Sequence, residues 1–96
     1  MNQLYAKGKI GKPPLQLIPL AALIPVSWVM QHGADRHGGP NNFLGDDLSL
    51  SLYTGALLRH IERMQSGEWI DETSGQPHVA HVAANALILL SGNIVP

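Results

Sequence analysis

The sequence predicts an all-α fold, a small helical hairpin or bundle of about three helices that homo-oligomerisation completes. Three segments carry apolar residues at helical spacing, and connections rich in glycine or proline separate them. The third segment, residues 77–91, contains no Asp, Glu, Lys or Arg. A helix that is apolar all round must be covered all round, and two neighbours from a 96-residue chain do not enclose it. We therefore expect a second copy of the chain at or near this helix.

The first helix is expected to begin around Pro19, because proline is favoured in the first turn, and to end near Gly33. Pro25 should kink this helix or move its start. The apolar run at residues 17–30 contains two prolines and is shorter than the ~20 residues that a membrane span needs. It therefore predicts a buried helix and no membrane partner. Residues 33–47 should be mostly loop, with one turn at residues 34–37.

The second helix is expected over residues 49–66. Residues 48–52 alternate leucine and serine, which by itself is a strand pattern, but the residues after them follow helical spacing. Asp47 or Ser49 suits the N-cap, and Gly67 suits the C-terminal stop. A ten-residue connection, residues 67–76, then leads to Pro77, which suits the first position of a third helix ending at Gly92.

Charge divides the chain into two parts. All three lysines lie in the first twelve residues, and all seven acidic residues lie from Asp35 onward. Residues 1–14, with their glycines and prolines, predict a flexible basic arm, and residues 15–96 predict a single all-α domain. A net charge of -1 and the lack of any DNA-reading motif predict no binding to duplex nucleic acid. The lack of cysteine excludes disulfides, thiolate zinc sites and thiol nucleophiles, and is compatible with a cytoplasmic location.

Three polar side chains interrupt the apolar third helix: His78, His81 and Asn85. Their spacing of three and four residues places them on one stripe, which points toward other helices. Two histidines at this spacing can share a metal ion, bind a phosphate or hold a catalytic water. Alternatively, His78 caps the helix while the other two form hydrogen bonds across the bundle.

The end of the second helix and the loop after it add basic, histidine and acidic side chains: Arg59, His60, Glu62, Arg63, Glu68, Asp71 and Glu72. If the second and third helices form an antiparallel hairpin, His60 comes close to His78 and to the loop acids. Glu68 and Asp71 could supply two oxygen ligands to Mg²⁺, which needs few protein ligands when phosphates provide the rest. The alternative is a solvated loop in which Asp71, Thr73 or Ser74 serves as a turn or cap residue.

The glycine-rich connection offers a weaker candidate. Arg36 or His37 could contact a phosphate and Asn42 a base edge, if residues 35–42 form a lid. The segment matches no P-loop or dinucleotide fingerprint, and turn formation also explains its composition.

Four stretches of the chain resemble one family. They are Leu-Ile-Pro-Leu-Ala-Ala-Leu at 17–23, Gly-Ala-Asp-Arg-His-Gly at 33–38 followed by Asn41-Asn42, Ala-Leu-Leu-Arg-His at 56–60, and Gly-Glu-x-x-Asp-x-x-Ser-Gly-x-x-His-x-x-His-x-x-x-Asn at 67–85. Over roughly residues 15–91 the chain is similar to the phage and prophage family of dATP/dGTP diphosphohydrolase N-terminal domains. The last stretch is the most specific, because seven polar or glycine positions recur there at fixed spacing.

The resemblance implies an all-α protein, often phage-encoded, that acts on purine deoxynucleoside triphosphates in the cytoplasm of the infected bacterium. It also implies a relationship to the MazG-type pyrophosphohydrolases, in which carboxylates hold Mg²⁺ against the triphosphate and water releases pyrophosphate. Those enzymes use two acidic pairs on consecutive helices. This chain has one pair, placed in a predicted loop, and has Thr54 and Gly55 where a helix acid is expected.

The resemblance also implies roles for individual residues. Glu68 and Asp71 resemble the acidic pair, so they are the metal candidates, and together with His81 they are the catalytic candidates. The candidates for nucleotide or phosphate binding are Arg36, His37, Asn42, Arg59, His60, His78 and Asn85.

Three functional hypotheses follow from the sequence. The first is Mg²⁺-dependent hydrolysis of purine (deoxy)nucleoside triphosphates to monophosphate and pyrophosphate. The second is a non-catalytic sponge that sequesters a nucleotide or cyclic oligonucleotide signal of host immunity, an anti-defence role favoured by the single acidic pair. The third is a structural helical module, favoured by the apolar third helix.

Overall fold

The computed structural model describes residues 11–39 and 47–95. Within them the predicted all-α fold is confirmed. There are three α-helices, α2 (Leu23–His37), α3 (Leu50–Gln65) and α4 (His78–Ser91), and two short 3-10 turns, η1 (Leu15–Leu17) and η2 (Leu20–Ala22), precede α2. The only sheet in this part of the chain is a minor parallel pair, β1 (Asp47–Ser49) and β2 (Asn93–Val95). Asn42 and most of the expected basic arm lie outside the described residues.

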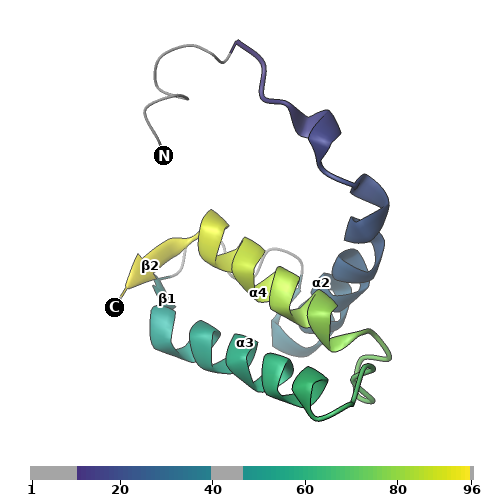
Figure 1. The fold of residues 1–96 in the computed structure, drawn as a ribbon. Coiled ribbons are helices and arrows are strands. Elements are labelled where there is room, and N and C mark those ends of the chain that lie inside the picture. The colour runs from purple at the N-terminus through teal and green to yellow at the C-terminus, as the bar shows by residue number, and fades with distance from the viewer. Residues whose placement is uncertain (1–10, 40–46, 96) are drawn as a thin grey trace.

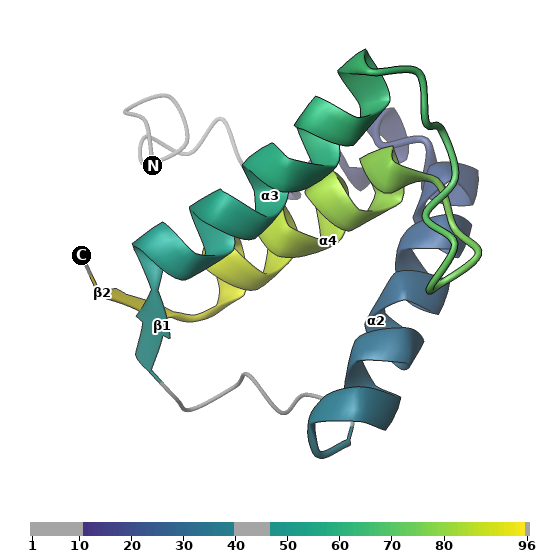
Figure 2. The ribbon, with the colours of Figure 1, turned by 90° about the horizontal axis from the view of Figure 1, so that it is seen from below.

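Helices α3 and α4 form the predicted antiparallel hairpin, and the connection between them turns the chain back at one end (Figure 1). Helix α2 crosses α4 near that same end (Figure 2). The loop end of the hairpin is thus the place where all three helices and the connection come together.

The small core lies where α2 meets α4. It consists of Val26 and Val29 from α2 with Ala80 and Ala84 from α4, all at most 7% exposed. The two alanines are four residues apart and therefore share one face, and their short side chains let α2 approach closely. This contact fixes the position of α4 relative to α2. It therefore also fixes the positions of the polar residues close to Ala80 in the sequence.

The two strands pair at the end of the hairpin that lies opposite the loop, where β1 leads into α3 and β2 follows α4. Leu48 pairs with Ile94 in register, and Leu48 is 3% exposed. Ser49 then caps α3, because its hydroxyl accepts a hydrogen bond from the Leu52 amide, as predicted for that position. The leucine and serine alternation at 48–52 therefore contributes a three-residue strand before the helical spacing takes over.

The bounds of α3 and α4 lie within one residue of the predicted ones. The first helix begins later than Pro19, in agreement with the prediction that Pro25 could move its start, but the prediction that it ends near Gly33 was wrong. Pro19 precedes only a 3-10 turn, and Pro25 occupies the first turn of α2, where its missing N–H costs no hydrogen bond. Gly33 continues the helix, so the expected turn at residues 34–37 is helical. The stop is Gly38, whose φ of 103° gives the left-handed conformation that ends helices.

Within the described residues, no helix combines the length and the apolar composition that a membrane crossing requires.

Candidate functional site

The loop between α3 and α4 has a defined conformation. Gly67, with a φ of 99°, ends α3, and Gly75, with a φ of 74°, turns the chain back toward α4. Ile70 and Pro77 form an antiparallel bridge across the loop, and the Asp71 amide donates to the Gln76 carbonyl at 2.9 Å. These contacts hold the acidic residues of the loop against the first turn of α4.

A chain of hydrogen bonds links Glu68, His78 and His60. His78 Nε2 lies 2.6 Å from Glu68 Oε2, and His78 Nδ1 lies 2.8 Å from His60 Nδ1. His78 is 4% exposed, and both of its ring nitrogens are engaged, so its polar atoms are satisfied despite burial. The predicted approach of His60 to His78 is thus confirmed. These hydrogen bonds connect α3, the loop and α4.

A second set of contacts surrounds His81. Its Nε2 lies 2.6 Å from Ser74 Oγ and 3.3 Å from Asp71 Oδ2. The ring of His81 stacks on that of His60, with centroids 4.3 Å apart and planes 12° from parallel. The other carboxylate oxygen, Asp71 Oδ1, accepts from the Thr73 amide at 2.8 Å. Asp71 therefore shapes the turn with one oxygen, as the alternative interpretation predicted, and faces His81 with the other.

The electrostatics of the site favour neutral imidazoles beside an ionised carboxylate. Burial lowers the pKa of His60, and the neighbouring His78 lowers it further. Burial also lowers the pKa of His81, with a further contribution from His60. Burial raises the pKa of Asp71, but the Thr73 hydrogen bond and the nearby His81 outweigh this effect, so the pKa is lower than usual. At neutral pH, His60 and His81 are therefore neutral imidazoles next to a negative charge.

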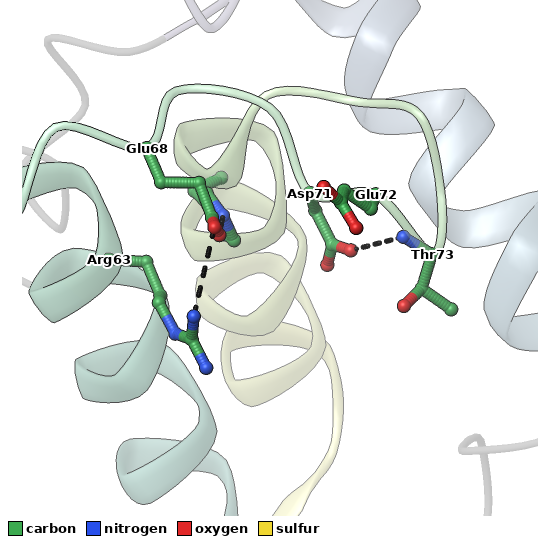
Figure 3. Close-up of a pocket in the computed structure, with 6 residues that line it drawn as sticks. Arg63, Glu68, Asp71, Glu72 and Thr73 are labelled. Atoms are coloured by element: carbon green, nitrogen blue, oxygen red, sulfur yellow. Dashed lines mark hydrogen bonds and ion pairs between the residues drawn. The ribbon is translucent and has the colours of Figure 1, made fainter.

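A polar pocket of about 370 Å³ opens beside this cluster. It is lined by Arg63, Glu68, Asp71, Glu72, Thr73 and His78. Figure 3 shows Arg63 reaching from α3 toward Glu68, with an Nη1 to Oε1 distance of 3.7 Å, while Asp71 and Glu72 come from the loop. The lining thus combines three carboxylates with one guanidinium group.

One group of side chains in the described residues has the geometry to hold a metal ion. His60, Asp71 and His81 each offer a ligand atom, and these atoms lie within 4.8 Å of one another. Glu68, which the sequence analysis paired with Asp71, lines the same pocket but bonds to His78 instead. The fold therefore surrounds Asp71 with imidazole nitrogens from two helices.

Comparison with known proteins adds to this geometry. A family described as dATP/dGTP diphosphohydrolase, N-terminal, matches residues 3–94. The chain belongs to this family. No curated protein and no solved structure matches it. The family name indicates a nucleotide hydrolase, an activity that requires a site for a polyphosphate and suggests a divalent metal ion.

In this member of the diphosphohydrolase family, the other described residues that were predicted for the site lie outside the histidine cluster. Arg36 and His37 are exposed at the end of α2, where Arg36 Nη1 lies 3.5 Å from His32 Nε2. Arg59 is exposed on α3, close enough to His60 to lower the pKa of that histidine. Asn85 Nδ2 donates to the carbonyl of His81 on its own helix at 2.9 Å. The structure therefore gathers the histidines and acids but leaves these residues outside the cluster.

The sequence analysis missed two residues of this diphosphohydrolase-family site. His32 lies near enough to His81 to lower the pKa of that ring, although it comes from α2. Ser74 bonds to the His81 ring, although the sequence analysis gave it no role beyond that of a turn or cap residue. No local signal marks His32, because its position depends on how α2 crosses α4. Ser74 stands at a fixed position in the motif at 67–85, and that position was the available signal.

Proposed function

We propose that this chain acts on the purine deoxynucleoside triphosphates dATP and dGTP, and that it hydrolyses them with Mg²⁺ to monophosphate and pyrophosphate. The observation that carries the proposal is the pocket with three carboxylates and one arginine, found at the most specific motif of a diphosphohydrolase-family chain. The proposed catalytic side chains are Glu68, Asp71 and His81.

The charge of the pocket explains why a divalent ion is needed. Glu68, Asp71 and Glu72 bring three negative charges, against one positive charge from Arg63. A triphosphate would be repelled by this lining unless a cation lies between them. Carboxylate oxygens fit Mg²⁺, which is bound by one or two carboxylates together with substrate phosphates. When bound, Mg²⁺ would neutralise phosphate charge and activate a water molecule.

The side chains of the protein would bind the ion, bind the phosphate and orient the carboxylate. Asp71 and Glu68 supply oxygens at the pocket wall, and Arg63 offers its guanidinium group to a phosphate oxygen. His81 contacts Asp71 from the α4 side and so holds that carboxylate in place. These roles require no movement of the helices, because the loop already presents the acids.

The proposal is tested by incubating the full chain with dATP, dGTP and the pyrimidine deoxynucleoside triphosphates plus Mg²⁺, then measuring monophosphate and pyrophosphate by chromatography. We expect turnover of the purine substrates. The Asp71→Asn variant should lose it at least 100-fold, since it removes the charge but retains an oxygen for the Thr73 amide. Asp35→Asn, on the exposed side of α2, removes the same charge elsewhere and should turn over normally. Absence of pyrophosphate with the unaltered chain, or equal turnover by Asp71→Asn, would contradict hydrolysis.

A second candidate function is a phage nucleotide sponge that acts against host defence in the bacterial cytoplasm. It is favoured by the partners that Glu68 and Asp71 already have, because a carboxylate held by histidine or arginine is a weaker metal ligand. In the same assay a sponge would remove a nucleotide or cyclic oligonucleotide from the filtrate and return it unchanged after heat denaturation. This binding should survive EDTA and be lost in Arg59→Ala or His81→Ala.

A further inference from the structure

We propose that His60, Asp71 and His81 form a binding site for a divalent transition-metal ion of the Zn²⁺ class, a different ion from the Mg²⁺ of the proposed hydrolysis, with which it would share Asp71. The donor set is two imidazole nitrogens and one carboxylate oxygen, which suits Zn²⁺ and its neighbours, whereas Mg²⁺ selects oxygen ligands. The site stands on the geometry of these side chains and does not depend on any turnover.

The spacing of the ligand atoms supports one shared ion. Two ligands that each lie ~2.1 Å from a tetrahedral ion are about 3.4 Å apart. His81 Nε2 and Asp71 Oδ2 are 3.3 Å apart, and a ligand atom of His60 lies within 4.8 Å of both residues. Asp71 Oδ2 and His81 Nε2 are thus already as far apart as two ligands of one ion. His60, on α3, supplies the third ligand.

The hydrogen-bond chain prepares His60 for this role. The contacts join Glu68 Oε2 to His78 Nε2 and His78 Nδ1 to His60 Nδ1. A carboxylate only accepts, so in the tautomer in which His78 Nε2 carries the single proton of the ring, His78 donates to Glu68 and accepts at Nδ1 from His60 Nδ1. This order puts the single proton of the His60 ring on Nδ1 and leaves a lone pair on Nε2. A carboxylate acting through a hydrogen-bond chain to fix the tautomer of a metal-ligating histidine is a common outer-shell arrangement. For this metal site, Glu68 and His78 are therefore positioning residues.

Binding requires a small local adjustment. The rings of His60 and His81 are stacked, so they must tilt for both lone pairs to converge on one ion. The hydrogen bond between the Ser74 hydroxyl and His81 Nε2, now 2.6 Å long, must break so that this nitrogen can bind the ion. Three protein ligands leave a fourth position for water or for an oxygen of a ligand in the adjoining pocket, as in zinc sites that are not closed by a fourth residue.

The test is equilibrium dialysis of the tag-free, chelator-stripped full chain against Zn²⁺, Co²⁺ and Mg²⁺ separately, with metal content measured by mass spectrometry. We expect one Zn²⁺ or Co²⁺ per chain and no competition from a hundredfold excess of Mg²⁺. Bound Co²⁺ should give visible absorption bands typical of four-coordinate nitrogen and oxygen ligation. Binding of no ion, or displacement of Zn²⁺ by Mg²⁺, would overturn the proposal.

Variants separate this site from adventitious binding. Asp71→Asn and His60→Gln should each weaken Zn²⁺ binding at least tenfold, and Asp35→Asn should leave it unchanged. Glu68→Gln should weaken binding 10- to 100-fold without changing the stoichiometry, and should shift the Co²⁺ bands because the His60 ring is no longer oriented. Circular dichroism verifies that each variant is helical. Equal Zn²⁺ affinity in Asp71→Asn and the unaltered chain would overturn the site, whether or not the chain hydrolyses nucleotides.

Discussion

His78 shows how one residue can serve both the fold and the site. It is the only polar or charged residue in the described part of the chain that counts as buried, and its ring joins Glu68 to His60. A buried polar group without partners costs roughly 1–3 kcal/mol. Replacement of His78 by an apolar residue would leave the inner nitrogen of His60 unpaired, so the position couples stability to the orientation of the cluster.

The lowered pKa values of His60 and His81 predict a loss of stability in acid. Their pKa values in the unfolded chain are near 6.5, and those in the folded chain are lower. As the pH falls below 6.5, the unfolded chain binds more protons than the folded chain, so the free energy of unfolding decreases until the folded pKa values are passed. The lowered pKa of Asp71 acts in the same direction at more acidic pH, below its usual 3.8.

Thermal melts of the metal-free chain in EDTA, followed by circular dichroism between pH 8 and pH 5, measure this effect. The melting temperature should be level above pH 7 and should decline below pH 6.5. The double variant His60→Gln/His81→Gln should decline less over the same interval, because it lacks both titrating groups. An identical decline in the double variant would show that other groups are responsible.

At the scale of elements, the strand pair leaves little space between Leu48 of β1 and Gly92, the residue between α4 and β2. A Cβ added to Gly92 would lie 2.9 Å from Leu48 Cγ and closer still to Leu48 Cδ1. The backbone of Gly92 is extended, so the requirement for glycine is space and not a left-handed conformation. Because Leu48 is buried, it has little room to move.

Gly92→Ala should therefore lower the free energy of unfolding by about 1–3 kcal/mol, as overpacking does. Gly33→Ala is the matched control, since nothing lies within 4 Å of a Cβ at that position and alanine favours a helix over glycine by about 0.5–1 kcal/mol. Urea denaturation should show that the free energy of unfolding decreases in Gly92→Ala and increases in Gly33→Ala. A neutral Gly92→Ala would mean that β1 and β2 do not pack as described.

For the whole molecule, the main feature is the apolar surface that three helices leave uncovered. Leu17, Leu52 and Leu90 are 76%, 71% and 82% exposed, and Trp28 on α2 is 58% exposed. Large exposed apolar side chains are candidates for contacts with a second copy of the chain. Homo-oligomerisation stays a prediction, and we expect side chains of this kind to take part in it.

Sedimentation velocity of the full chain should give a mass above the 10.3 kDa of one chain and a concentration-dependent distribution. Leu90→Glu should shift the distribution toward the monomer, because a charge at the exposed end of α4 disfavours apolar contact. Arg36→Glu alters charge on exposed α2 surface and should leave the distribution unchanged. A single 10.3 kDa species at all concentrations would contradict the prediction.

The sequence by itself determined the helices and the neighbours within the hairpin. The bounds of α3 and α4 follow from Ser49, Gly67, Pro77 and Gly92, because caps and breakers act over a few residues. The approach of His60 to His78 was expected if the ten-residue connection made the two helices antiparallel, and it is observed. The extent of α2 was mispredicted, since glycine tolerates a helix interior and the true stop, Gly38, stands five residues later.

Only the tertiary structure decided the partners of each side chain. Glu68 and Asp71 look like a pair in the sequence, yet Glu68 bonds to His78, while Asp71 faces His81 and accepts from the Thr73 amide. The sequence spacing of Glu68 and Asp71 fixes only how far apart they are along the chain. The direction in which each carboxylate points depends on the rotation of α4 against α3 and on the turn at Gly75. The crossing of α2 likewise brings His32 toward His81. Local propensities are settled within a few residues, whereas the chemistry of a site depends on contacts between residues distant in the chain.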